Sequence, residues 1–165
     1  MGQAHEILIL PGDGIGPEVM TEAIKVLQIF NGPLHTFNLQ YEIVGGCSID
    51  KNGTSVTQEV IQAALNADAV LFGAVGGPKW DNVRRGLDGP EGGLLQIRKA
   101  LDVYANLRPC SADSPSTSIS KEYSPYKEKI IQGVDFLVLR ENCGGAYFGK
   151  KVENEDYGIA YPPAI

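Results

Sequence analysis

Three arginines and one tyrosine are the residues whose chemistry combines most readily: Arg98, Arg108, Arg140 and Tyr147. A guanidinium group matches a carboxylate with two parallel hydrogen bonds, so a site that grips a small dicarboxylate needs several arginines. The phenol of Tyr147 follows Arg140 beyond a glycine turn and is able to act as a general acid. Each of the four taken singly also fits a structural role. Together they suggest a site for a small anionic substrate.

Two of these arginines fall on segments that we expect to be strands. Asn106 and Arg108 alternate along one face of an extended segment over 106–110. Arg140 ends the apolar run 136–139, which predicts a buried strand. We therefore expect the guanidinium of Arg140 to be buried and paired, because a buried unpaired charge is strongly unfavourable.

A helix expected to start near Pro90 and to end near Tyr104 carries the third arginine. Glu91, Leu94 and Arg98 are spaced i, i+3 and i+7, so they share one face of that helix within roughly 60°. An acid, an apolar residue and a base on one stripe suit a ligand with both alkyl and carboxylate parts. The alternative is a solvated Glu and Arg at the edge of a core.

A glycine-rich turn, 12–18, links a strand to the start of a helix. Glycines there let backbone N–H groups approach a ligand, and the helix dipole favours an anion. The spacing differs from the dinucleotide pattern G-x-G-x-x-G, since the third glycine comes one residue early and Pro17 removes a donor. A tight structural turn is therefore the favoured interpretation.

The elements that must position these residues alternate between strands and helices. The pattern predicts strands over 7–10, 37–44 and 69–72, with helices that begin at Pro17, after Thr57 and at Pro90. This alternation is typical of an α/β fold with a largely parallel sheet. The expected apolar stripes are Met20, Ile24, Leu27 and Phe30 in the first helix and Val60, Ile61, Ala64 and Leu65 in the second. The Ser- and Pro-rich segment 111–125 indicates a linker or surface loop, and 147–149 is expected to pair back onto 136–140.

Composition narrows the function classes. The 165 residues include 14 Lys and Arg against 20 Asp and Glu, a net charge of -6, and 43% hydrophobic residues. This composition argues against global disorder, and its acidity argues against nucleic-acid binding. No apolar run approaches the roughly 18 residues that a membrane span needs, and the sequence has no recognisable targeting segment. We expect a cytoplasmic protein whose three cysteines are reduced thiols.

Several long stretches, in a fixed order, resemble the isocitrate/isopropylmalate dehydrogenase family of β-decarboxylating dehydrogenases, and within it the 3-isopropylmalate dehydrogenases. The matching stretches are LPGDGIGPEV (10–19), GAVGGPKW (73–80), LLQIRK (94–99), YANLRPC (104–110), RE (140–141) and GGAYFG (144–149). The resemblance implies a parallel or mixed sheet flanked by helices, with residues 1–107 in a first domain and 108–165 opening a second, substrate and dimerisation domain.

The resemblance also implies roles for individual residues. Arg98, Arg108 and Arg140 would bind the malate carboxylates, and Tyr147 would protonate the enol after decarboxylation. Leu94 and Leu95 would contact the isopropyl group, which favours an alkylmalate over isocitrate. Glu91 would lie near the nicotinamide end of NAD, and Ile15 would also bind the cofactor.

The family reaction is hydride transfer from a secondary alcohol to NAD followed by loss of CO2, with Mg2+ or Mn2+ polarising the new carbonyl. The resemblance thus implies NAD, one of these metal ions, an alkylmalate of leucine biosynthesis and a homodimer, with neither nucleic acid nor membrane as partner. We expect the catalytic Lys, the metal-binding Asp residues and the adenosine-binding loop to lie outside these 165 residues. The alternative is a catalytically inactive, truncated paralog that binds a ligand or a partner.

The sequence departs from the family pattern just before the two leucines. The family usually has Arg-Pro-Glu-Gln-Gly there, whereas 89–93 read Gly-Pro-Glu-Gly-Gly. Inside a helix, each of the adjacent Gly92 and Gly93 would cost roughly 1 kcal/mol relative to Ala.

Overall fold

The computed structural model describes residues 2–80, 89–112, 124–142, 151–153 and 157–160. The chain divides into two compact units, Met1–Asp102 (unit 1) and Val103–Ile165 (unit 2). The boundary between residues 107 and 108, which the resemblance implies for the complete family fold, stays a prediction.

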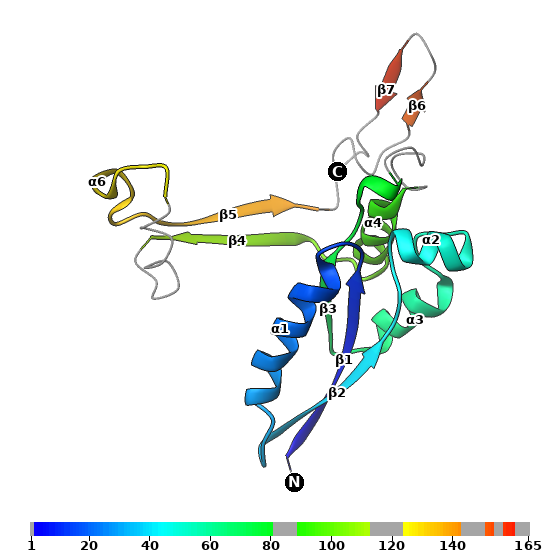
Figure 1. The fold of residues 1–165 in the computed structure, drawn as a ribbon, viewed down its shortest axis with the longest axis horizontal. Helices are drawn as coiled ribbons and strands as arrows, with labels where there is room; N and C mark the ends of the chain where they lie inside the picture. The colour runs from blue at the N-terminus through cyan, green and yellow to red at the C-terminus, as the bar shows by residue number, and fades with distance from the viewer. Residues whose placement is uncertain (1, 81–88, 113–123, 143–150, 154–156, 161–165) are drawn as a thin grey trace. The chain divides into compact units, whose positions relative to one another are not determined.

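The sheet of unit 1 has three parallel strands in the order β2-β1-β3 (Figure 1). The strands are β1 (Gln3–Gly12), β2 (His35–Tyr41) and β3 (Ala69–Ala74). The helices described in this unit are α1 (Gly16–Ile29), α2 (Gly46–Asn52), α3 (Gln58–Asn66), α4 (Pro90–Ala100) and the short 3-10 helix η1 (Pro78–Trp80). Because the strands are parallel, their carboxyl ends meet at one edge, where ligands bind in open α/β sheets.

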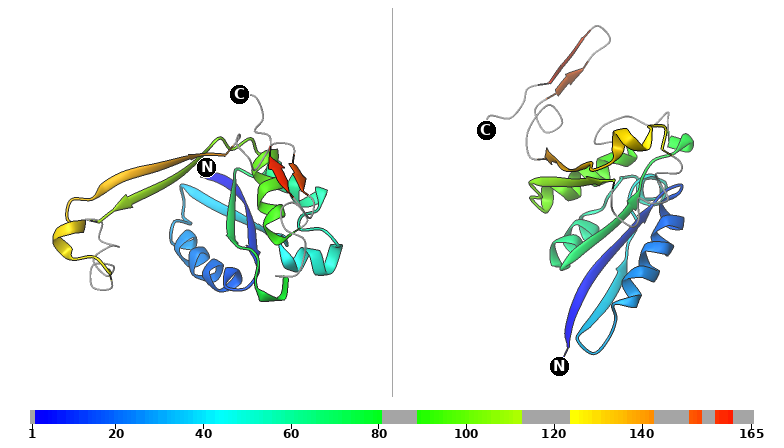
Figure 2. Two further views of the ribbon diagram at one scale, coloured as in Figure 1. Left: turned by 90° about the horizontal axis from the view of Figure 1, so that it is seen from above. Right: turned by 90° about the vertical axis from the view of Figure 1, so that its left-hand side faces the viewer.

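Alternate residues of β1 enter two different hydrophobic cores. Ile7 and Ile9 pack with Met20 of α1 on one face of the sheet. Leu8 and Leu10 pack on the other face with residues of α3 and α4, among them Val60, Ala64 and Ile97. Figure 2 shows α1 on one side of the sheet and α3 and α4 on the other. The period of two along a strand therefore produces a helix-sheet-helix sandwich.

Unit 2 is built on antiparallel pairs. β4 (Ala105–Ser111) pairs with β5 (Asp135–Glu141), and β6 (Lys151–Glu153) pairs with β7 (Gly158–Ala160). The short helix α6 (Glu128–Ile131) precedes β5. Every residue of β5 is exposed.

The predicted α/β fold is confirmed, and so are the helix starts. α1 has a proline in its first turn, and the Thr57 side chain accepts a hydrogen bond from the backbone N–H of Val60 (3.4 Å) at the start of α3. The predicted helix from Pro90 ends earlier than expected, at Ala100, and Asp102 just beyond it adopts a left-handed backbone with φ 52°.

Other details of the prediction are wrong. The second strand spans His35–Tyr41 instead of 37–44. Phe30 and Leu65 are exposed, because they lie at or near the ends of their helices and beyond the reach of the sheet. Arg140 is also exposed, since no layer of described residues covers β5.

Some elements escaped prediction, and some predictions lie outside the described residues. The short elements α2, α6, β6 and β7 were not expected from the sequence. Residues 113–123 of the expected loop, and the expected pairing of 147–149, fall outside the described residues. None of the helices within the described ranges is both long and apolar enough to cross a membrane.

Candidate functional site

The glycine-rich turn brings the carboxyl ends of β1 and β3 together. Gly12 has φ 77°, and a Cβ atom on it would overlap the carbonyl oxygen of Ala74. The backbone N–H of Asp13 donates to that same carbonyl oxygen at 2.7 Å. Ile15 follows at the N-cap of α1 and is 56% exposed. These contacts are those of a tight structural turn that also presents one apolar side chain at the sheet edge.

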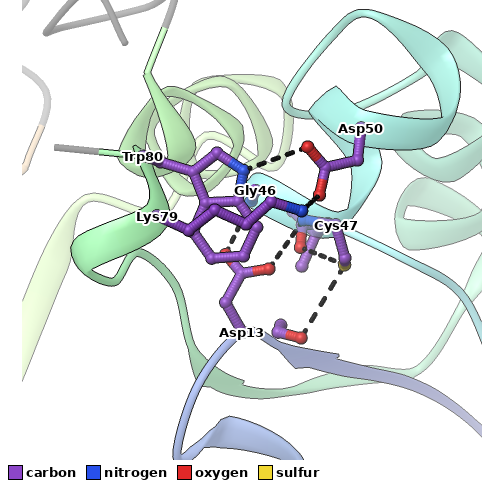
Figure 3. Close-up of polar contacts among 8 residues, drawn as sticks. Asp13, Gly46, Cys47, Asp50, Lys79 and Trp80 are labelled. Atoms are coloured by element: carbon purple, nitrogen blue, oxygen red, sulfur yellow. Dashed lines mark hydrogen bonds and ion pairs between the residues drawn. The ribbon is translucent and has the colours of Figure 1, made fainter. Parts of the chain in front are cut away.

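The carboxylate of Asp13 holds three backbone segments at this edge (Figure 3). Its Oδ2 accepts hydrogen bonds from the N–H groups of Gly46 (2.6 Å) and Gly76 (3.0 Å), and its Oδ1 accepts one from Cys47 (2.7 Å). The Asp13 side chain is only 4% exposed. The start of α2 and the loop after β3 are thus tied to the end of β1.

Cys47 is not a reactive thiol. Its Sγ donates to the carbonyl oxygens of Val44 (3.2 Å) and Gly12 (3.7 Å). Burial raises the pKa of the Cys47 thiol, and the nearby Asp13 carboxylate raises it further. Because the thiolate is the nucleophilic form, Cys47 has a structural role.

The loop after β3 is also fixed from the outside of α2. The Trp80 indole packs directly on the backbone of Gly46 and donates from Nε1 to Oδ1 of Asp50 at 3.3 Å. Lys79 Nζ lies 2.5 Å from Asp50 Oδ2 and 5.2 Å from the centroid of the Trp80 ring (Figure 3). The hydrogen bond from Lys79 lowers the pKa of Asp50.

Helix α4 places a carboxylate over this loop. Glu91 is exposed in the first turn, and a Cβ atom built on Gly76 would lie 3.0 Å from Oε1 of Glu91. A Cβ atom on Gly93 would lie 2.7 Å from the carbonyl oxygen of Ser55 and 2.8 Å from Cγ2 of Val44. Gly93 therefore permits a close approach of α4 to the loop before α3, which explains a glycine that looked costly in the sequence.

The remaining predicted residues of α4 lie farther along the helix. Leu94 and Leu95 are half-buried in its second turn, and Arg98 is half-buried in its last turn. Leu94 and Arg98 are four residues apart and are therefore neighbours on one face. The predicted stripe of acid, alkyl group and base exists on this helix.

In unit 2 the register of β4 and β5 brings two arginines to one face. Asn106 lies opposite Arg140, and Arg108 lies opposite Val138. Arg108 and Arg140 are therefore diagonal neighbours, a relation that places Cα atoms about 7–8 Å apart. Arg108 Nε donates to Oδ1 of Asn106 at 2.9 Å. Both arginines are exposed, so this face of the β4–β5 pair presents two guanidinium groups to an anion.

The predicted site residues thus form two groups. Ile15 and Glu91 lie at the carboxyl edge of the sheet in unit 1, and Arg108 and Arg140 share a face in unit 2. Arg98 belongs to unit 1, so its approach to the other two arginines stays a prediction. Tyr147 lies outside the described residues.

The role of Asp13 was missed in the sequence, where the turn was judged by its glycines. The sequence does contain one signal, because Asp13 lies between two glycines. A flexible turn does not require a carboxylate at that position, so the acidic residue indicates another role. A metal site is not found among the described residues, which contain no group of three His, Cys, Asp or Glu side chains that could hold an ion.

Comparisons with known proteins agree with one another. The family model described as isocitrate/isopropylmalate dehydrogenase matches residues 6–162. A 3-isopropylmalate dehydrogenase B of Aspergillus niger is 66% identical over 157 residues, which are 95% of this chain and 42% of that protein. A 3-isopropylmalate dehydrogenase of Hapsidospora chrysogena is 52% identical over 158 residues, which are 94% of this chain and 40% of that protein.

A solved structure shares the fold. The crystal structure of the apo form of a β-decarboxylating dehydrogenase from Thermococcus kodakarensis is similar with a TM-score of 0.60 and 27% sequence identity. The match covers 96% of this chain and 40% of that one. The chain therefore spans about two fifths of the length of the relatives that it matches.

Proposed function

Because the chain belongs to the isocitrate/isopropylmalate dehydrogenase family, we propose that it recognises 3-isopropylmalate and NAD in an enzyme that oxidises and decarboxylates this alkylmalate. The observation that carries the proposal is the shared face of Arg108 and Arg140, in a chain 66% identical to a 3-isopropylmalate dehydrogenase. A cytoplasmic location, assembly as a homodimer and the lack of nucleic-acid or membrane partners belong to the same proposal.

The arginines would hold the carboxylates of the substrate. Two exposed arginines that are diagonal neighbours on one face, with Cα atoms about 7–8 Å apart, are able to engage two carboxylates of one small molecule. Asn106 lies beside both and supports the orientation of Arg108 through its 2.9 Å hydrogen bond. Arg98 would supply a third guanidinium group from α4.

The two leucines of α4 would select an alkyl group. Leu94 and Leu95 are half-buried, so part of each side chain can contact a ligand while the rest is anchored in unit 1. Burial of a branched alkyl group against them is favourable, by about 0.8 kcal/mol for each CH2 group removed from water. A carboxylate placed against the two leucines would instead lose hydration that their apolar side chains cannot replace. This contrast favours 3-isopropylmalate over isocitrate.

The residues at the sheet edge fit the nicotinamide end of NAD. Ile15 offers an exposed apolar surface for a ring, and the Glu91 carboxylate offers acceptors for an amide or for ribose hydroxyls. When bound, NAD supplies the hydride acceptor. The chain's own contribution is to orient the alcohol carbon and the cofactor at the carboxyl edge of the sheet.

In the proposed reaction the alcohol is oxidised first, CO2 is then lost, and the product is protonated. The alcohol carbon loses a hydride and its hydroxyl loses a proton, which gives a keto acid. The bond between the adjacent carbon and its carboxylate then breaks, CO2 leaves, and the electron pair of that bond forms an enolate, the ionised form of the enol. Tyr147 would protonate the enol carbon. The described residues do not fit Mg2+ or Mn2+, so no step is assigned to the metal ion.

Calorimetric titration with 3-isopropylmalate tests the proposal directly. We expect the 165-residue chain to bind 3-isopropylmalate more tightly than isocitrate, and Arg108→Ala to weaken that binding about tenfold or more, since a charged hydrogen bond is lost. Lys129→Ala removes another exposed cation of unit 2, from α6, and should leave the affinity unchanged. Equal affinity of wild type and Arg108→Ala, or no binding by wild type, would contradict the proposal.

A further inference from the structure

Asp13 is the one buried carboxylate among the residues that the structure describes. Its carboxylate accepts hydrogen bonds from three backbone N–H groups, and each belongs to a segment other than its own. A charge in such a place requires several good hydrogen bonds to compensate for the loss of water. The glycines alone could form the turn, so the buried carboxylate of Asp13 has a further role.

We propose that Asp13 is a positioning residue for the nicotinamide end of the cofactor, an inference that rests on the proposed function. Asp13 is two residues before Ile15, and it fixes the Gly76 backbone over which the Glu91 carboxylate lies. Asp13 is therefore connected to both proposed cofactor contacts, to Ile15 along the chain and to Glu91 through the backbone of Gly76. A displacement of the Gly76 backbone would change the surface over which the Glu91 carboxylate lies.

The hydrogen-bond pattern demands a carboxylate at this position. Two N–H groups, of Gly46 and Gly76, point at Oδ2, and the N–H of Cys47 points at Oδ1. Asparagine has nearly the same shape but carries an NH2 group in place of one oxygen. In either orientation of the amide, at least one backbone N–H would face a donor instead of an acceptor. Asp13→Asn therefore tests the hydrogen bonds with little change in volume.

Asp50 provides a matched control on the opposite side of the same loop. Its carboxylate holds Lys79 and Trp80 from the exposed side of α2, whereas Asp13 holds Gly76 from the buried side. The hydrogen bonds of the Asp50 carboxylate go to Lys79 and Trp80, which lie outside the segments of Ile15 and Glu91. Asp50→Asn therefore weakens the attachment of Lys79 and Trp80 and leaves the hydrogen bond from Gly76 to Asp13 in place.

Trp80, the single tryptophan of the chain, makes the experiment practical. NADH is titrated into wild type, Asp13→Asn and Asp50→Asn, and energy transfer from Trp80 to NADH reports binding. Titration with 3-isopropylmalate by calorimetry is the second readout. We expect Asp13→Asn to weaken NADH binding about tenfold while the affinity for 3-isopropylmalate is unchanged, and Asp50→Asn to keep both affinities. A merely structural role would weaken both ligands together.

The outcomes separate this inference from the proposed function. Wild-type affinity for NADH in Asp13→Asn, or an equal loss in Asp50→Asn, would overturn the inference and leave the proposed function intact. A wild-type chain that binds neither ligand would overturn both. If Asp13→Asn does not fold, NMR spectra of the wild-type chain titrated with NADH provide the test. The amide resonances of Ile15, Gly76 and Glu91 should then shift together with NADH, and unchanged resonances would overturn the inference.

Discussion

Residues 7–10 of β1 and residues 136–139 of β5 are alike in sequence and differ in their surroundings. Each segment is a run of four large apolar residues inside a strand. In β1, Leu8 is 1% exposed and Ile9 is fully buried. In β5, Leu139 is 57% exposed and even Val138, the least exposed of the four, is 43% exposed.

The difference comes from the layers around each strand. β1 has a strand on each side and helices against both faces, so every second residue enters a different core. β5 pairs with β4 alone, and that pair is one layer thick within the described residues. An apolar run therefore predicts a strand, whereas its burial depends on elements distant in the sequence.

Truncation of one leucine in each strand should give the largest contrast. Leu8→Ala leaves a cavity between the sheet and α3, and we expect it to lower the free energy of unfolding by about 2–5 kcal/mol. Leu139→Ala removes an exposed side chain and should change it by about 0.5 kcal/mol or less. Urea unfolding of both variants, followed by Trp80 fluorescence and circular dichroism, measures the two effects. Similar losses in both variants would show that β5 is covered in solution.

Close packing within unit 1 predicts a smaller effect at a glycine. Gly93→Ala would force a methyl group against Ser55 and Val44, and we expect a loss of about 1–3 kcal/mol despite the better helix propensity of Ala. Gly32→Ala is the control, because nothing lies within 4 Å of a Cβ atom there. A stabilised Gly93→Ala chain would mean that α4 does not approach the loop before α3 as closely as described.

The smallest expected effect is a loss of stability in alkaline solution that depends on Cys47. The pKa of Cys47 is raised above its ordinary 9.0, so the folded chain keeps a proton that the unfolded chain loses. The stabilisation is complete at pH values below the ordinary pKa of the thiol, and it declines as the pH rises toward the raised pKa of the folded chain. Between about pH 8 and 10, wild type should therefore lose more stability than Cys47→Ala. Parallel pH profiles for wild type and Cys47→Ala would contradict the buried environment of Cys47.

Local signals in the sequence were enough for much of the fold. Pro17 and Thr57 mark helix starts because their effects act within one turn. The strands β1 and β3 were predictable because 7–10 and 69–72 are short apolar runs bounded by turn residues. The short helix α2 was missed, since its place depends on Asp13 and Trp80, which lie 33 and 30 residues away in the sequence from the α2 residues that they bind.

The candidate site was predictable only in part, for the same reason. The shared face of Arg108 and Arg140 follows from alternation once the strands pair, and the pairing register was not in the sequence pattern. The exposure of Arg140 was wrongly predicted because an apolar strand was equated with a buried one. Asp13 could not be assigned from its neighbours, because its partners Gly46 and Gly76 belong to loops that only the fold brings together.

The most direct measurement of the central claim is an NMR titration of the arginine side chains with 3-isopropylmalate. The account predicts that the Nε–Hε resonances of Arg98, Arg108 and Arg140 shift along one common binding curve, because all three bind the same small diacid. Acetate at the same concentration, with one carboxylate and no alkyl branch, should not produce this common curve. Three separate curves, or shifts of one arginine alone, would contradict the claim that the three guanidinium groups converge on one ligand.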